Sequence, residues 1–490
     1  MPAPLECLPF YGGEFHAPAS DEWRVVDDPA DGSRVGRCAL ANAADIDRAV
    51  GHALRAKSAW ADIHADGRAA ILHRAADLIE ARSDEIAELL TREQGKPLCD
   101  SRKEIGFGVQ VVRYYAEEGR RKFGSLRPSS LPNVKNVVSY FPVGVVGAIV
   151  PWNYPVDLYC WKVAPALAAG CPIVVKPPHE TPFAIAAVLE CFVEAGVPSG
   201  VLANLPGTGM EAGAALARHP DVACISATAS VAAGQDIMRN AAGNLKRLSL
   251  ELGGHSPFIV LPDADVEAAA KAAMRRSFSN MGQICITVNR ILTHPEAHSP
   301  FVDALVAETE TIELGPGLDP GRLYGPVTTG SVIERSQLHI DDAVSKGARI
   351  VTGGGRAASG ELGKGLFFQP TLLDDAPLDS LPMTEETYGP VAAIRSCGSL
   401  DELLAVSNSL SFGLAAYVYS EDLELAWALA DRLEFGAVGI NVSDTSELQA
   451  PFGGWKLSGF GRELGPEGLD AFLEPKHVKM RVNPLVQRHL

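Results

Sequence analysis

Several motifs that would announce a metal or nucleotide enzyme are missing from this 490-residue sequence. It contains no H-E-x-x-H pair, no paired C-x-x-C and no phosphate-binding P-loop, so we predict neither a metal site nor a nucleoside-triphosphate site. Its nine cysteines are odd in number and scattered along the chain. This usage favours reduced thiols in the cytoplasm over a disulfide framework.

Long apolar runs and an excess of basic charge are missing too. The best apolar run, residues 137–150, is interrupted by Pro142, Gly144 and Gly147, so we expect strands there and no membrane-spanning segment. The formal net charge of −17 argues against a nucleic-acid partner. Residues 1–15 have neither the pattern of a signal peptide nor that of a transit peptide. The length predicts at least two domains.

Apolar strands and amphipathic helices alternate through residues 145–251. This pattern predicts a parallel, doubly wound sheet with helices on both faces, and such sheets bind ligands beyond the carboxyl ends of their strands. A second α/β block extends from residue 257 to about 450, with a strand at 257–260, a helix at 265–278 and a strand at 286–292. In the first block we expect strands at 145–150, 172–176, 201–205, 222–226 and 246–250, and helices at 155–169, 182–195, 210–218 and 231–242.

Two short glycine-containing segments carry the most reactive side chains. Glu251 precedes Leu-Gly-Gly at the end of a predicted strand, and Cys285 ends the segment Gly282-Gln-Ile-Cys. A nucleophilic Cys that forms a thioester needs a partner that activates water, and a carboxylate can do this. Taken singly, an unpaired Cys is more often a buried structural residue, and a strand-end Glu more often forms a salt bridge.

With Pro151-Trp152-Asn153, these segments resemble the aldehyde dehydrogenase superfamily, and the resemblance extends over nearly the whole chain. Its hydrolytic members, among them betaine, aminoaldehyde and generalist aldehyde dehydrogenases, are the most similar. The resemblance implies that Cys285 is the nucleophile and Glu251 the general base. It also implies that Asn153 and the Cys285 backbone N–H hold the oxyanion, and that Lys162 and Glu463 form a proton-relay pair.

The same resemblance implies NAD or NADP as cofactor. Members of the family usually carry a Glu three residues after the Lys that matches Lys176, and this Glu repels a 2′-phosphate. Here His179 stands in its place, so both cofactors stay open, while Glu180 is expected to point elsewhere on the following helix. Ala229 replaces a Gly in a phosphate-contacting segment, and a Tyr replaces the usual Phe at 388. The implied cofactor contacts are Trp152, Lys176, His179, Gly209, Gly213, Thr228, Ser230, Glu386 and Tyr388.

A stripe of side chains at the start of the helix at 155–169 is expected to line the substrate tunnel. The resemblance places Tyr154, Asp157 and Trp161 there, opposite Ser446 and Phe452. Succinate-semialdehyde members carry Arg where this chain has Trp161 and Ser279, which disfavours a carboxylate-bearing aldehyde. Two aromatic residues and an acid would suit a cationic or amino aldehyde. Generalist members also carry this Trp, however, and Asp157 could simply be an acid near a helix N-terminus, so both interpretations stay open.

The predicted fold class is therefore two doubly wound parallel α/β domains plus a β-strand arm. We expect residues 1–122 and 143–254 to bind the dinucleotide, 255–453 to form the catalytic domain, and 123–142 with 470–490 to form an arm that pairs subunits of a homodimer or homotetramer. The predicted reaction converts a small-molecule aldehyde to its acid. Two alternatives are a coenzyme-A-acylating dehydrogenase, disfavoured by Glu251, and a catalytically silent structural member of the fold, disfavoured by the intact catalytic residues.

Overall fold

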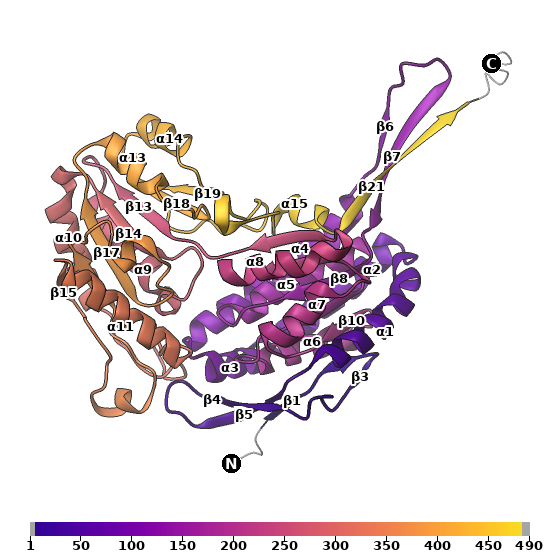
Figure 1. Cartoon of the computed structure of the whole chain (residues 1–490), viewed down its shortest axis with the longest axis horizontal. Helices are drawn as coiled ribbons and strands as arrows, with labels where there is room; N and C mark the ends of the chain where they lie inside the picture. The colour runs from indigo at the N-terminus through magenta and orange to yellow at the C-terminus, as the bar shows by residue number, and fades with distance from the viewer. Residues whose placement is uncertain (1–4, 483–490) are drawn as a thin grey trace.

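Two large sheets and a projecting arm organise the chain (Figure 1). The computed structural model describes residues 5–482. The first sheet has eight strands in the order β20 (Gly459–Phe460), β12 (Arg247–Glu251), β11 (Val222–Thr228), β8 (Val145–Ile149), β9 (Ile173–Lys176), β10 (Leu202–Asn204), β2 (Phe10–Tyr11) and β3 (Glu14–Phe15). The second has seven, in the order β15 (Arg349–Thr352), β16 (Thr371–Asp374), β17 (Val391–Ser396), β14 (Val288–Thr293), β13 (Ser256–Val260), β18 (Ala415–Tyr419) and β19 (Ala437–Ile440).

Helices cover both faces of the first sheet, which explains why β8 and β9 are buried along their whole length. Val145 and Ile149 pack with α1 and α7, whereas Val146 and Ala148 pack with α5 and α6, as the two-residue repeat of a strand requires. The helices around this sheet are α1 (Ala43–Ala61), α2 (Ala65–Ala81), α3 (Ser83–Gln94), α4 (Leu98–Arg121), α5 (Pro155–Ala169), α6 (Phe183–Glu194), α7 (Ala214–Arg218), α8 (Val231–Ala241) and α15 (Gly465–Asp470).

The central strands β12, β11, β8, β9 and β10 pair in parallel, as the alternating pattern predicts. The chain builds outward from β8 through β9 and β10, then crosses back to add β11 and β12 on the other side. This reversal between β8 and β11 leaves a crevice at the carboxyl ends of the strands. The residues that follow β8 and end β11 and β12 therefore meet at that crevice.

The second sheet is also mainly parallel and forms the other lobe in Figure 1. Its helices are α9 (Val266–Phe278), α10 (Pro295–Glu310), α11 (Gly330–Ser345), α12 (Leu381–Thr384), α13 (Leu400–Asn408) and α14 (Leu423–Ala430). Together the two sheets confirm the predicted α/β fold class, whereas the exact residue boundaries of the domains stay a prediction. A small sheet of β1 (Leu5–Cys7), β5 (Arg34–Ala39) and β4 (Trp23–Asp27) packs beside α6.

Some element boundaries differ from those predicted. The predicted helix 210–218 begins as a π-helical turn, η1 (Gly209–Gly213). Thr208 caps the N-terminus of this turn, because its side chain accepts from Glu211 N at 3.2 Å. The predicted strand 286–292 begins at Val288, because Thr287 N donates to the carbonyl of Ile284 and continues a turn. The predicted helix 182–195 begins at Phe183, so residues 179–180 lie in a bend outside it.

The arm is a three-stranded antiparallel sheet in the order β21 (Leu473–Arg481), β7 (Val134–Pro142) and β6 (Ser125–Arg127). It projects from the first lobe, and most of β21 is exposed (Figure 1). These strands lie within residues 123–142 and 470–482 of the predicted arm, whereas residues 483–490 lie outside the described part of the chain. Within residues 5–482, no helix combines the length and apolar character needed to cross a membrane.

Candidate active site

The predicted nucleophile lies after a tight turn at the end of α9. Asn280, Met281 and Gly282 in the turn η3 (Ser279–Gly282) all have positive φ, 48°, 54° and 72°. A side chain at 282 would meet the carbonyl oxygen of Gly389 at 2.2 Å, so only Gly fits there. This sharp turn brings Cys285 out of the helix and into the space between the two lobes.

Two cavities meet at the thiol. A cavity of about 410 Å³ extends along the start of α5, and a second of about 350 Å³ extends over the carboxyl ends of β8, β11 and β12. Asn153, Thr228 and Cys285 line both. A molecule in either cavity can therefore reach Cys285.

Asn153 follows β8 at the crevice between the sheets. It is buried, and its side-chain nitrogen donates to the carbonyl oxygen of Gln283, two residues before the thiol, at 3.1 Å. The amide oxygen of Asn153 has no hydrogen-bond partner among the described residues. The second N–H of this amide remains available near Cys285, as an oxyanion donor requires.

Glu251 ends β12, directly beside Thr228 of β11. It lines the larger cavity together with Cys285. Both carboxylate oxygens lack a hydrogen-bond partner within residues 5–482. Burial, with Glu463 nearby as a second acid, raises the pKa of Glu251 well above its ordinary value. An unbonded carboxyl with a raised pKa is suited to accept a proton from water.

Burial and negative neighbours also raise the pKa of the Cys285 thiol. Loss of solvation is the largest cause, and the carboxyls of Glu251 and Glu386 add to it. The protein without its ligands therefore favours the neutral thiol. A positive charge near the sulfur would lower this pKa again.

Lys162 and Glu463, the predicted proton-relay residues, form a buried ion pair close to Glu251. Lys162 Nζ lies 2.6 Å from Glu463 Oε1 and donates to Thr228 Oγ1 at 2.7 Å. Ser226 donates to the same carboxylate oxygen at 3.3 Å. The pair thus sits close enough to Glu251 to act on its pKa, with Glu463 raising it and Lys162 lowering it.

The predicted cofactor residues divide into two groups. Trp152, Thr228, Ser230, Glu386 and Tyr388 all line the second cavity, and the Trp152 and Tyr388 rings meet edge to face with centroids 5.6 Å apart. Four others, Lys176, His179, Gly209 and Gly213, do not line it.

The expectation for Glu180 was wrong. We expected this side chain to point away from the cofactor, but Glu180 lines the second cavity. The reason is the bend at 179–180, since a residue outside α6 does not follow the helix repeat. Arg24 of β4 lines the same cavity and carries no sequence signal for this role. Val26 lies two residues from Arg24 on the same face of β4, and it packs against Phe183 at the start of α6. Arg24 therefore lies on the side of β4 that faces α6 and the neighbouring Glu180.

The second cavity suits a dinucleotide. Glu386 is half-buried, accepts from Gly254 N at 3.2 Å, and has its pKa raised to about 7 by loss of solvation of the carboxylate. A side chain at Gly253 would meet Glu386 Oε2 at 2.4 Å, so the glycine keeps this wall of the cavity clear. A carboxylate with a free oxygen can accept from ribose hydroxyls, and the N-terminus of α8, capped by Ser230, can face a phosphate.

The five predicted tunnel residues, Tyr154, Asp157, Trp161, Ser446 and Phe452, all line the larger cavity. Trp161 packs edge to face against Phe452 with ring centroids 5.3 Å apart, and Phe107, which sequence reasoning missed, packs on its other side. Asp157 is buried, and its Oδ1 has no hydrogen-bond partner among the described residues. Asp157 thus lines the cavity as a buried acid at the start of α5.

Three basic residues of the tunnel were also missed. Arg276 pairs with Asp444 at 2.5 Å, Lys103 pairs with Asp100 at 2.8 Å, and Arg275 is exposed where it lines the same cavity. The adjacent arginines at the end of α9 show no pattern that distinguishes a tunnel position from an ordinary helix C-terminus. The tunnel thus combines aromatic walls with charges of both signs.

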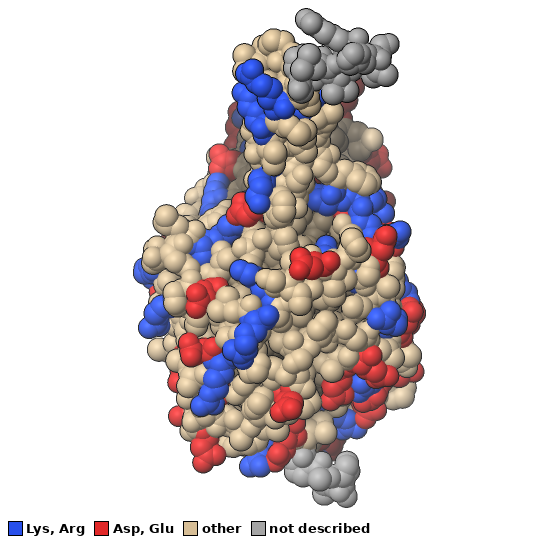
Figure 2. Space-filling view, turned by 90° about the vertical axis from the view of Figure 1, so that its right-hand side faces the viewer, with Lys and Arg blue, Asp and Glu red and all other residues tan. Residues whose placement is uncertain are grey.

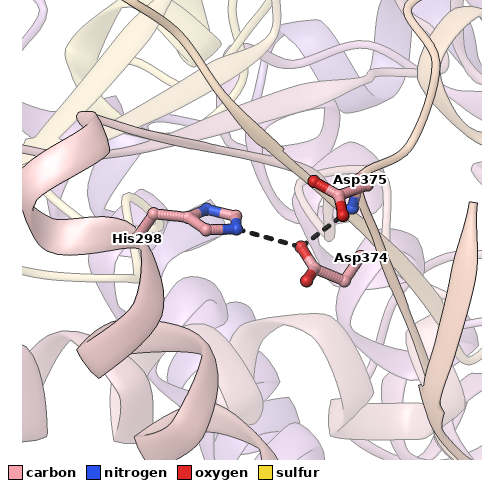
Figure 3. A group of neighbouring side chains, drawn as sticks. All are labelled: His298, Asp374 and Asp375. Carbon is pink, nitrogen blue, oxygen red and sulfur yellow. Dashed lines mark hydrogen bonds and ion pairs between the residues drawn. The ribbon is translucent and has the colours of Figure 1, made fainter.

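Away from this site, His298, Asp374 and Asp375 place possible metal-ligand atoms within 4.8 Å of one another (Figure 3). Arg349 Nη2 contacts both carboxylates, at 2.6 and 3.1 Å, and His298 Nε2 lies 3.2 Å from Asp374 Oδ1. One guanidinium group already bridges the two acids. The cluster is therefore accounted for as an ion-pair network.

Comparison with known proteins agrees with this geometry. Residues 15–478 match the model of the aldehyde dehydrogenase family. Succinate semialdehyde dehydrogenase of Acinetobacter baylyi is 40% identical over 453 residues, covering 92% of this chain and 93% of the relative. The NADP(+) succinate-semialdehyde dehydrogenase of Escherichia coli is 38% identical over 453 residues, with the same coverage of both chains. The structure of betaine aldehyde dehydrogenase from Staphylococcus aureus with NAD+ is 34% identical, with a TM-score of 0.95 over 97% of this chain and 95% of that one.

Proposed function

This chain belongs to the aldehyde dehydrogenase family as an NAD(P)-dependent enzyme, and we propose that it oxidises its aldehyde through a thioester on Cys285. The observation that carries the proposal is the position of the thiol, where the two cavities meet beside Asn153 and Glu251. An aldehyde in the tunnel and a dinucleotide in the second cavity would approach the same sulfur from opposite sides.

In the first step Cys285 loses its proton to solvent and its sulfur bonds to the aldehyde carbon. The carbonyl oxygen takes the displaced electron pair and becomes an oxyanion. The Asn153 amide and the backbone N–H of Cys285 donate to this oxygen. NAD or NADP, when bound in the second cavity, supplies the acceptor for the hydride that this carbon loses, and a thioester on Cys285 results.

In the second step Glu251 takes a proton from water while the water oxygen bonds to the thioester carbon. The carbon–sulfur bond then breaks, which releases the carboxylic acid and restores Cys285. Both oxygens of Glu251 are free to receive this proton. Glu463 and Lys162 are positioned to return it toward solvent.

The substrate we favour carries a cationic or amino group. Asp157 adds an acidic side chain to the tunnel lining, and Tyr154 and Trp161 add aromatic rings. Burial raises the pKa of Asp157 well above its ordinary value, and an entering ammonium group would favour the ionised form. A generalist enzyme for uncharged aldehydes is the alternative, since the same aromatic walls suit apolar chains.

A carboxylated aldehyde is a second candidate, because the relatives quoted above include enzymes named for succinate semialdehyde. Arg275 and Arg276 both line the tunnel. Arg276 is already engaged by Asp444, and Trp161 and Ser279 occupy the positions where arginines hold the carboxylate in succinate-semialdehyde members. These residues favour the cationic substrate over the carboxylated one.

A panel of cationic, neutral, aromatic and carboxylated aldehydes, run with both NAD and NADP, tests the substrate class. We expect the highest kcat/KM for the cationic aldehydes of the panel. A clear preference for succinate semialdehyde would refute the assignment. Addition of coenzyme A separates the acylating alternative, because only that enzyme would accelerate with it. Mass spectrometry of acid-quenched enzyme should find the acyl group on Cys285, and Cys285→Ala should bind cofactor without turnover.

We further propose that the arm joins subunits of a homodimer or homotetramer. Phe123, Leu126, Val478 and Met480 are exposed apolar residues on or beside the arm, which rises at the top of Figure 2. β21 is an open edge of the arm, and β19 is an open edge of the second sheet. Since open strand edges pair readily, a partner's arm could extend that sheet. Sedimentation velocity should find a dimer or tetramer, and a monomer in the Val478→Glu/Met480→Glu variant.

A further inference from the structure

A buried ion pair below the oxyanion site is the strongest unexplained feature of the chain. Lys96, between α3 and α4, pairs with Glu104 of α4, and their side chains are 1% and 0% exposed. Burying two charges costs free energy that their attraction does not always repay, so such a pair is weak evidence for a stabilising role. Its contacts point to a different role.

Lys96 holds the backbone of Asn153. Its Nζ donates to the carbonyl oxygen of Asn153 at 2.8 Å and lies 3.8 Å from the centroid of the Tyr154 ring. Lys96 thereby fixes the peptide group between these two residues. The orientation of that peptide determines where the Asn153 side chain leaves the backbone.

Glu104 holds the next turn of the same segment. Its Oε1 accepts from Val156 N at 2.9 Å and Asp157 N at 3.3 Å, the first free N–H groups of α5. The residue at the normal capping position, Tyr154, makes no side-chain cap. Glu104 supplies the cap from another helix, so one carboxylate joins α5 to Lys96.

The segment around Lys96 also holds the loop that carries the thiol. Gln94 Nε2 donates to Asn280 Oδ1 at 3.0 Å, and Asn280 Nδ2 donates to the same Asn153 carbonyl at 3.2 Å. Lys96 N donates to Gln94 Oε1 at 2.8 Å. The Asn153 loop and the Cys285 loop are therefore both anchored to residues 94–96.

We propose that the Lys96–Glu104 pair is a positioning element of the oxyanion site, which holds the Asn153 amide in register with Cys285. This inference rests on the oxyanion role proposed for Asn153. Lys96 lines neither cavity and reaches the site through the Asn153 carbonyl, whereas Glu104 lines the tunnel and holds the start of α5. Loss of the pair should slow thioester formation while leaving thioester hydrolysis by Glu251 unchanged.

The test is a single-turnover measurement with enzyme in excess, which reports the rate of cofactor reduction. Lys96→Met/Glu104→Gln removes both charges together, and Gln keeps an oxygen for the N–H groups of α5. We expect cofactor reduction to slow about tenfold to a hundredfold, because small displacements of a catalytic group cost rate of this order. The control is Arg102→Met, which breaks an exposed pair between Arg102 of α4 and Asp84 of α3 and should react at the wild-type rate.

A double-mutant cycle with Asn153→Ala distinguishes positioning from general damage. If the pair acts through Asn153, its removal in the Asn153→Ala background should slow cofactor reduction by less than about twofold. Full multiplication of the two effects, or a wild-type rate in Lys96→Met/Glu104→Gln, would overturn the inference. An equally large decrease in the rate at which the acyl-enzyme decays, measured by mass spectrometry, would also overturn it.

The Asn153→Ala variant alone tests the underlying proposal. If it reduces cofactor at the wild-type rate, the oxyanion role of Asn153 fails and the positioning role fails with it. If Asn153→Ala is slow but Lys96→Met/Glu104→Gln is not, only the positioning role fails. Should the charge-free double variant not fold, Lys96→Arg, which keeps the buried charge but reshapes its donors, carries the same test.

Discussion

Replacing Glu251 by Gln should separate the two halves of the reaction. The amide keeps the size of the carboxyl but cannot take a proton from water. Loss of a general base lowers a rate by about 10²- to 10⁴-fold, equivalent to roughly 3–5 kcal/mol of transition-state stabilisation. Glu463 cannot replace Glu251, because it lines neither of the two cavities that meet at Cys285. We therefore expect the acyl-enzyme to accumulate.

Rapid mixing of the Glu251→Gln variant with aldehyde and cofactor should show a burst of reduced nicotinamide of about one equivalent per active site, followed by a very slow steady rate. Acid-quenched enzyme should carry the acyl mass on Cys285. Steady turnover within a few-fold of wild type, or a burst without the adduct, would refute the role of Glu251.

Stability provides an independent control for the same variant. Because burial raises the pKa of Glu251, the folded protein favours the protonated carboxyl. Wild type therefore loses stability as the pH rises above the ordinary Glu pKa, while unfolded chains ionise freely. Glu251→Gln lacks this loss, so the difference in Tm between variant and wild type should shift in favour of the variant as the pH rises. A variant that loses activity but shows this trend is not misfolded.

Three further changes test the cavities. The affinity of the wild-type protein for the cofactor should increase as the pH rises through about 7, where Glu386 ionises and can accept from ribose hydroxyls. In the Glu386→Gln variant the affinity should be weaker and independent of pH. Equal pH profiles for the two proteins would contradict this role of Glu386. Arg24→Glu should lower kcat/KM for NADP relative to NAD by about tenfold, since like charges repel, and an unchanged ratio would exclude Arg24 from cofactor selection. Asp157→Leu should abolish any preference for cationic aldehydes in the substrate panel while retaining neutral ones, whereas a retained preference would remove Asp157 from substrate recognition.

The local sequence pattern predicts the parts of the site that lie at strand ends. Apolar repeats locate β8 and β12, and the residues that follow or end them, Asn153 and Glu251, lie at the crevice as expected. Helix starts were less predictable, because the caps of α5 and α6 come from distant residues. Glu104 caps α5, and Glu93 caps α6 by accepting from Phe183 N and Ala184 N at 2.7 and 2.9 Å.

Such tertiary caps cannot be read from the flanking residues that capping rules use. The expectation for Glu180 was wrong because it used the helix repeat for a residue that lies in a bend before α6. The role of Lys96 escaped prediction because the carbonyl that it holds, that of Asn153, lies far along the chain, and Arg24 escaped because it reaches the cavity from a separate small sheet. A charged residue on a short strand or before a proline carries no local mark of burial or of a cavity.

The meeting of two cavities at one sulfur also predicts how the protein can be inhibited. A thiol-reactive reagent that is slim and apolar should enter by the aromatic channel and alkylate Cys285 while a dinucleotide occupies the opposite side. A molecule that joined an aldehyde mimic to a nicotinamide mimic through a short linker would fill both passages at once. Because the two halves would bind as one, its affinity should far exceed that of either fragment.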